Sequence, residues 1–322
     1  MKKVLITGGA GFIGSHLADY YTKKGIAVVV VDDMSAGNLS NLAGIDPALL
    51  EVVVADIRDE KLMSSLVPGC DLVVHLAARV GLKAVVKHPL GTLETNVDGT
   101  ASVLRAARET KTKVIVASTS EVYGLASRIP SSENDPITIG SPMRNRWSYA
   151  ASKVLDEFMA IGYWREHHVP TVVVRLFNTV GPRQSGRYGM VIPSFIRMAT
   201  AGEPLTVHGD GTQTRCFCHV RDVVGALARL AEDPSAVGEI FNLGNPEEIS
   251  INDLAARVIA LAGSSSPITY VSYDDAYGEG FEDIQRRVPD IAKIRKAVGF
   301  APSARLDEIL REIIAGLYAA VA

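Results

Sequence analysis

The sequence predicts an α/β fold, with a doubly wound parallel sheet and a smaller α/β domain for a substrate. Short Val/Ile-rich runs alternate with helical patterns as far as Arg175, the order typical of a parallel sheet with helices on both faces. A glycine-rich turn follows the first run, and an acidic pair ends the second. Strict alternation is lost after Arg175, which indicates a second unit of short strands, loops and helices.

The first strand is expected over 3–7 and the first helix over 12–24. Between them, glycines permit a tight turn and let the backbone approach a pyrophosphate at the helix N-terminus. This strand–turn–helix unit predicts a Rossmann-type dinucleotide site; the alternative is a glycine turn with only a structural role. The cofactor contacts expected here are Gly8, Gly11, Phe12, Ile13 and Gly14.

The second strand, expected over 27–31, ends in Asp32-Asp33. Asp32 lies where a carboxylate can accept hydrogen bonds from the adenosine ribose of a dinucleotide. The same carboxylate would repel the 2′-phosphate of NADP, so NAD is the expected cofactor. The alternative is a solvated acidic loop.

Later strands are expected over 51–55, 71–75, 113–117 and 171–175, and helices over 89–108 and 147–167. Ligands of a doubly wound sheet gather at the carboxyl ends of its strands. Asp56 and Ile57 follow one strand and are expected near the adenine. Leu76, Ala77 and Ala78 follow the next and would let the cofactor pass close to the sheet.

Tyr149 and Lys153 open the helix expected over 147–167. Their spacing of four residues places them one turn apart on one helix face. A free phenol has a pKa of about 10, and a nearby ammonium favours the phenolate and lowers that value. The pair is therefore a candidate base for alcohol oxidation, although Tyr-x-x-x-Lys alone also occurs on ordinary helices.

The stretch Ser118-Thr-Ser-Glu121 follows the strand over 113–117. The hydroxyls of Ser118, Thr119 or Ser120 could hold a substrate hydroxyl against the phenol, and Thr119 and Ser120 are the candidate catalytic residues. Glu121 adds a carboxylate that simple alcohol oxidation does not need.

A strand over 239–243 and a helix over 250–262 indicate a return to the sheet late in the chain. We expect an NAD-binding domain of 1–177 plus about 217–262. The substrate domain is expected to comprise 178–216 plus 263–322.

The composition excludes several functional classes. With 322 residues and a formal charge of −3, the chain gives no indication of nucleic-acid binding. No apolar run reaches the roughly 18 residues of a membrane span, and the apolar start lacks a cleavage pattern, so we expect a cytoplasmic protein.

The three cysteines fit a reducing compartment without disulfides. Cys216 and Cys218, two apart on one expected strand, could face a metal together, but four ligands are not completed; we expect core packing and no metal site.

Together, the glycine turn, Asp32, Ser118-Thr-Ser-Glu-Val-Tyr-Gly124 and Tyr149-x-x-x-Lys153 resemble the extended short-chain dehydrogenases that act on nucleotide sugars. The resemblance covers almost the whole chain. It implies NAD as cofactor and a nucleotide sugar, with UDP as the expected nucleotide, as substrate. Tyr149 would take the proton of the sugar 4-hydroxyl while NAD takes the hydride. It also implies a homodimer formed by the helices over 90–108 and 147–167.

Further stretches extend this resemblance to substrate binding. Residues 175–183 look like the family's entry into the substrate domain, where Asn178 would contact the sugar nucleotide. Residues 202–215 look like its diphosphate segment, where Arg215 would bind phosphate; the alternative for Arg215 is a surface ion pair. Arg187, in a loop of the same domain, is a further candidate ligand.

The family's 4-keto intermediate has three common fates, and the resemblance orders them. Thr-Ser-Glu121 is found in glucuronate decarboxylases and GDP-mannose 4,6-dehydratases, whereas similar 4-epimerases usually carry a small residue there. Residues 277–291 are similar to bacterial UDP-glucuronate decarboxylases, with Arg287 matching their active-site arginine. It would hold the substrate carboxylate and orient a proton; the alternative is a diphosphate ligand. Residues 77–81 are closer to 4-epimerases.

We therefore expect UDP-glucuronate decarboxylation first, a UDP-hexose or uronate 4-epimerase second, and a 4,6-dehydratase third. A non-enzymatic NAD-sensing module would require a degraded catalytic set. The tyrosine, the lysine and the hydroxyls are all intact in this sequence.

Overall fold

A seven-stranded sheet forms the centre of the computed structural model, with the strand order β11-β6-β5-β4-β1-β2-β3. The structure describes residues 1–126, 128–186, 190–277 and 283–321. All neighbouring strands in this sheet are parallel. The strands are β1 (Lys3–Thr7), β2 (Ala27–Asp32), β3 (Leu50–Val54), β4 (Leu72–His75), β5 (Lys113–Thr119), β6 (Thr171–Leu176) and β11 (Ile240–Leu243). The order reverses between β1 and β4, so the ligand crevice of a doubly wound sheet lies there. The predicted fold class and the predicted central strands are confirmed.

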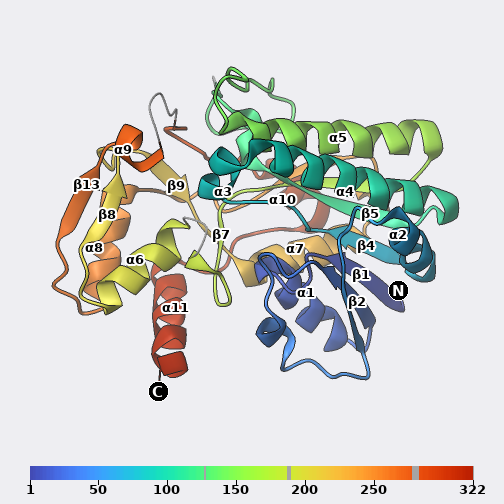
Figure 1. The fold of residues 1–322 in the computed structure, drawn as a ribbon, viewed down its shortest axis with the longest axis horizontal. Helices are drawn as coiled ribbons and strands as arrows, with labels where there is room; N and C mark the ends of the chain where they lie inside the picture. The colour runs from blue at the N-terminus through green and yellow to red at the C-terminus, as the bar shows by residue number, and fades with distance from the viewer. Residues whose placement is uncertain (127, 187–189, 278–282, 322) are drawn as a thin grey trace.

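Helices cover both faces of this sheet (Figure 1). One face carries α2 (Glu60–Leu66), α4 (Pro89–Thr110) and α5 (Trp147–His167), and the other carries α1 (Phe12–Thr22), α7 (Val220–Glu232) and α10 (Ala292–Val298). Val4 and Ile6 of β1 belong to the core with α1 and α7, whereas Leu5 belongs to the core with α4. This alternation buries both faces of the sheet, which explains why its strands are nearly continuous runs of valine and isoleucine.

The helix α7 is absent from the predicted elements. His219 caps its N-terminus by accepting a hydrogen bond from the Arg221 backbone N–H. Buried apolar residues recur along it at helical spacing, namely Val220, Val223, Val224, Leu227 and Leu230. This amphipathic pattern was the signal that could have predicted it.

A second core lies beside the sheet and contains α6 (Val191–Thr200), β8 (Leu205–His208), α8 (Ile251–Leu261) and α11 (Leu306–Val321) (Figure 1). Outside the main sheet, β8 pairs with β13 (Ile268–Val271), β9 (Thr214–Cys216) with β12 (Glu248–Ser250), and β7 (Thr179–Val180) with β10 (Cys218–His219). The chain also contains α3 (Leu82–Lys87), α9 (Tyr273–Tyr277) and, directly after β5, the 3-10 helix η3 (Ser120–Tyr123). Because the buried residues of α8 belong to this second core, we propose that α8 be counted with the smaller domain.

The three cysteines are free and buried. The expectation that Cys216 and Cys218 share a strand is wrong, because Cys216 ends β9 and Cys218 begins β10, and these strands pair with different partners. Within the described residues, no group of three or more His, Cys, Asp or Glu side chains is placed to hold a metal ion. In the same part of the chain, no helix has the length and apolar character needed to cross a membrane.

Candidate active site

A cleft of about 960 Å³ lies at the carboxyl ends of the central strands and is lined by residues of both cores. Every site residue that the sequence predicts and the structure describes lines this cleft. Arg187 lies outside the described residues. The structure thus brings together side chains that are far apart in the chain, which makes this cleft the candidate active site.

The glycine turn between β1 and α1 forms one end of the cleft. Gly8 has a φ of +68°, and a Cβ there would lie 2.9 Å from the backbone N of Ala77. A Cβ on Gly14 would lie 2.2 Å from the carbonyl oxygen of Gly8. Both positions therefore require glycine. The N-terminus of α1 carries no side-chain cap, so its first N–H groups remain available to phosphate oxygens.

Asp32 ends β2 beside this turn and is buried. Its two oxygens accept hydrogen bonds from the backbone N–H groups of Ala10, at 3.0 Å, and Met34, at 2.9 Å. Burial raises the pKa of the Asp32 carboxyl, while these hydrogen bonds oppose the rise. Each oxygen keeps a second lone pair, so the carboxylate can still accept a hydrogen bond from a ribose hydroxyl.

The two residues predicted to contact the adenine, Asp56 and Ile57, both have side chains that already contact other residues. Ile57 is buried, and its side chain fills the space that a Cβ on Gly99 would need. Asp56 forms an ion pair with Arg58, which holds the pKa of the Asp56 carboxyl below its usual range. The loop before α2 therefore presents one fixed apolar side chain and one already paired carboxylate to the cleft.

Tyr149 lies in the first turn of α5 and faces the cleft. Burial raises the pKa of its phenol, and the carboxylate of Glu121 raises it further. A hydrogen bond with Thr119 and the charge of Arg287 act in the opposite direction. The net effect is a phenol pKa above its usual value.

Lys153 lies one turn after Tyr149 and is buried. Its ammonium forms an ion pair with Asp156, with 2.9 Å between Nζ and Oδ2. Asp156 was not among the predicted site residues. A carboxylate three residues after the lysine on the same helix was the available signal.

The hydroxyls at the end of β5 divide between two environments. Ser118 donates a hydrogen bond to Glu157 at 2.5 Å and is thus engaged away from a substrate. Thr119 accepts a hydrogen bond from the Glu121 backbone N–H at 3.2 Å and also contacts the Tyr149 phenol. Thr119 and Ser120 both line the cleft, so they remain the hydroxyls that can orient a substrate.

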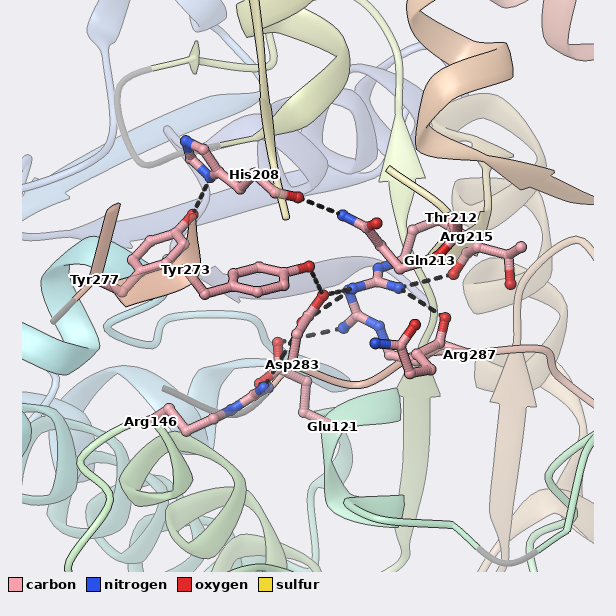
Figure 2. A network of polar contacts seen from close by, with 12 residues as sticks. Glu121, Arg146, His208, Thr212, Gln213, Arg215, Tyr273, Tyr277, Asp283 and Arg287 are labelled. Carbon is pink, nitrogen blue, oxygen red and sulfur yellow. Dashed lines mark hydrogen bonds and ion pairs between the residues drawn. The ribbon is translucent and has the colours of Figure 1, made fainter. Parts of the chain in front are cut away.

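Three arginines and two carboxylates form a continuous chain of ion pairs at the other end of the cleft (Figure 2). We call this set the arginine cluster; its members are Glu121, Arg146, Arg215, Asp283 and Arg287. Glu121 lies 3.3 Å from Arg287 and 3.4 Å from Arg146. Asp283 lies 3.8 Å from Arg146 and 2.9 Å from Arg215. Arg146 and Asp283 were not among the predicted site residues, although Asp283 lies within the stretch 277–291 that resembles the decarboxylases.

The arginine cluster carries a formal charge of +1. Burial, followed by the like charge of Arg287, lowers the pKa of Arg215. Burial acts to raise the pKa of Asp283, but the neighbouring arginines and the Tyr273 hydroxyl outweigh it and keep the value low. The Nε of Arg287 is buried and has no hydrogen-bond partner among the described residues. A surplus cation with an unused donor is suited to an anionic ligand.

The predicted substrate ligands of the smaller domain reach the same cleft. Arg215 forms an ion pair with Asp283, but Arg215 is buried. The alternative prediction of an ion pair at the protein surface is therefore wrong. Asn178 donates a hydrogen bond from Nδ2 to the Cys216 carbonyl at 3.1 Å, which fixes its amide against β9. Asn178 and Arg215 both line the cleft.

Comparison with known proteins gives close relatives over nearly the whole chain. The UDP-N-acetyl-alpha-D-glucosaminuronate decarboxylase of Bacillus cytotoxicus is 43% identical over 317 residues, which cover 97% of each chain. UDP-glucuronic acid decarboxylase 1 of Xenopus tropicalis is 37% identical over 314 residues, covering 97% of this chain and 71% of the relative. The solved structure of the UDP-glucuronic acid 4-epimerase from Bacillus cereus, in complex with UDP-glucuronic acid and NAD, matches with a TM-score of 0.88 at 28% identity, covering 99% of each chain.

A sequence model of GDP-mannose 4,6 dehydratase matches residues 5–313. This match covers both cores and the cleft between them. The chain therefore belongs to the GDP-mannose 4,6 dehydratase family of extended short-chain dehydrogenases, the superfamily that its motifs predict.

Proposed function

We propose that this protein is an NAD-dependent enzyme that decarboxylates a UDP-linked uronic acid through a 4-keto intermediate. One observation carries the proposal: Glu121 and Arg287 are paired 3.3 Å apart in the cleft that contains Tyr149. A 4-epimerase changes only C4. Its reaction has no step that would require a carboxylate and a guanidinium in addition to the catalytic tyrosine. The two decarboxylases among the relatives support this choice.

The residues at the glycine turn fit NAD. The uncapped N-terminus of α1 suits a diphosphate, and Asp32 suits a ribose and disfavours a 2′-phosphate. The lack of a Cβ at Gly8 and Gly14 allows the turn to close. When bound, NAD would supply a reversible hydride acceptor for C4 of the sugar.

The chain's own residues account for the proton movements at C4. Tyr149 would accept the proton of the 4-hydroxyl, which Thr119 orients, and the Lys153 ammonium would favour the phenolate. Oxidation at C4 turns the uronic acid into a β-keto acid. The bond between C5 and the carboxylate then breaks, CO2 leaves, and the electron pair passes into an enolate that spans C5, C4 and the C4 oxygen. Protonation at C5 and reduction of the C4 carbonyl complete the pentose.

The arginine cluster would serve the steps that follow oxidation. Arg287 would hold the substrate carboxylate before the bond breaks, and its positive charge would then stabilise the enolate. Glu121, which is paired with Arg287 and Arg146, would orient a water molecule that gives C5 its proton. Arg215 and Asn178 would bind the nucleotide diphosphate at the edge of the smaller domain.

A UDP-uronate 4-epimerase is the second candidate. It is favoured by the fold-level match to the UDP-glucuronic acid 4-epimerase, which covers 99% of both chains. The 4,6-dehydratase is third and has the support of the family match. All three reactions begin with the same oxidation at C4, so they differ only in what the cleft does to the 4-keto sugar.

Product analysis separates these candidates. The NAD-saturated protein is incubated with UDP-glucuronate, UDP-N-acetylglucosaminuronate and UDP-glucose, and CO2, epimers and NADH are measured. We expect CO2 from at least one uronate and no product from UDP-glucose. C4 epimers of the uronates without CO2 would establish the epimerase instead, and a 4-keto-6-deoxy sugar from UDP-glucose would establish the dehydratase.

We also propose a homodimer formed through α4 and α5, which lie side by side on one face of the sheet (Figure 1). Large apolar side chains are exposed on these helices: Leu90, Leu155 and Phe158, with Phe158 71% exposed. Sedimentation should show a dimer for the wild type and a monomer for Phe158→Glu; a monomeric wild type would contradict this. The three free cysteines support the further proposal of a cytoplasmic location.

A further inference from the structure

A buried carboxylate that the proposed chemistry does not use lies next to the catalytic lysine. Asp156 follows Lys153 by one turn of α5, and the side chains of Lys153 and Asp156 are only 3% and 0% exposed. Nζ of Lys153 lies 2.9 Å from Oδ2 of Asp156. Burial of an ion pair costs several kcal/mol of desolvation per ion, so a purely stabilising role is a weak explanation for this pair.

Two neutral side chains, His75 and Thr100, neighbour the pair of Lys153 and Asp156. Nε2 of His75 lies 3.0 Å from the Thr100 hydroxyl, and Nδ1 lies 2.8 Å from the Thr7 hydroxyl. Burial, followed by the charge of Lys153, lowers the pKa of His75 to about 3, so the imidazole stays neutral. Burial raises the pKa of the Asp156 carboxyl, Lys153 and then Thr100 oppose that rise, and the charge of Glu157 adds to it. Asp156 is therefore the group among these that balances the ammonium.

Asp156 also acts on Tyr149, the proposed catalytic base. Burial is the largest cause that raises the pKa of the Tyr149 phenol. Two carboxylates, Glu121 of η3 and Asp156 of the same helix, raise it further. Arg287 and the hydroxyl of Thr119 act against them. The carboxylate of Asp156 therefore acts on Tyr149 as well as on Lys153, and both lie on the same helix.

We propose that Asp156 is a positioning residue that holds the Lys153 ammonium in place and, by balancing its charge, sets the pH at which Tyr149 becomes a base. The inference rests on the roles proposed above for Tyr149 and Lys153. Loss of the carboxylate leaves the ammonium uncompensated beside the phenol, which favours the phenolate. It also leaves Lys153 buried without its partner, which favours the neutral amine. The acid and alkaline limbs of the pH profile should therefore both move to lower pH.

The test compares Asp156→Asn with Asp156→Glu, which keeps the charge, and with a matched control, Glu157→Gln. Glu157 is the next residue of α5 and is also a buried carboxylate, but it pairs with Arg175 at 2.7 Å. Two readouts are needed on NAD-saturated protein: the pH profile of kcat/KM on the nucleotide sugar that is turned over, and ultraviolet difference titration of the Tyr149 phenol against Tyr149→Phe. The titration requires no turnover.

We expect Asp156→Asn to lower both apparent pKa values and the phenol titration midpoint by about one unit or more, and Asp156→Glu to restore them partly. Glu157→Gln should lower the melting temperature and move these values less than Asp156→Asn does, because Glu157 acts on Asp156 only weakly and is itself paired with Arg175. Equal loss of activity at every pH, with an unmoved phenol titration, would overturn the proposal. If Asp156→Asn does not fold, Asp156→Ser, which carries no charge, decides in the same assays. If the wild type turns over no nucleotide sugar, the proposed function fails while the phenol titration still decides this inference.

Discussion

Replacing Arg287 with alanine removes the surplus positive charge of the arginine cluster. The cluster contains three arginines and two carboxylates, so its formal charge falls from +1 to zero, and Glu121 loses a partner at 3.3 Å. A carboxylate about 4 Å from a guanidinium gains about 4 kcal/mol at an effective dielectric constant of about 20. Removal of one stabilising donor from a water-excluded site costs about 2.7–4 kcal/mol. We therefore expect CO2 release from the UDP-uronate to fall about 10²–10³-fold.

Binding of UDP alone provides the comparison, because UDP lacks the sugar carboxylate. Calorimetry should show a change of less than about tenfold, or about 1.4 kcal/mol, for Arg287→Ala. The matched control is Arg286→Ala, since Arg286 is 55% exposed and pairs with Glu248 at 2.8 Å. It should leave CO2 release close to wild type. If Arg287→Ala weakened UDP binding as much as it slowed CO2 release, Arg287 would be a diphosphate ligand and the assignment would be refuted.

Three further changes test other parts of the molecule. Tyr149→Phe should lower turnover by about 10²–10⁴-fold, the usual contribution of a general base, while NAD binding is retained; near-wild-type turnover would remove Tyr149 from its role. Asp32→Ala should weaken NAD more than NADP in titrations with both cofactors, and equal affinity of the wild type for both would show that Asp32 is misassigned. Tyr21→Phe should leave the melting temperature unchanged or raised, because the Tyr21 hydroxyl is buried and lacks a hydrogen-bond partner within the described residues; a clear fall would indicate a missed partner.

The central sheet could be predicted from the sequence because both of its faces are buried. Val4 and Leu5 of β1 enter different cores, so each strand appears in the sequence as a short unbroken apolar run. The smaller domain lacks this signal. The chain passes from β9 to β10 between Cys216 and Cys218, and a local pattern of alternation cannot show that such closely spaced residues pair with different strands.

The cleft was also predictable, because residues that follow parallel strands meet at one edge of the sheet. Local spacing identified Tyr149 and Lys153 and could have identified Asp156 on the same helix, but it could not identify the arginine cluster. Arg215 meets Asp283 across 68 residues of sequence, and this pairing depends on how the smaller domain folds over the cleft. Ion pairs of this kind arise from tertiary distances and leave no periodic pattern in the sequence.

The most direct test of the central claim is turnover of UDP-glucuronate and UDP-N-acetylglucosaminuronate in D2O, followed by NMR of the sugar product. The claim is that this cleft breaks the bond between C5 and the carboxylate, so that C5 must take a proton from solvent. We predict release of CO2 and a UDP-pentose that carries deuterium at C5. A C4 epimer that keeps its carboxylate and carries no deuterium at C5 would contradict the claim and establish the 4-epimerase.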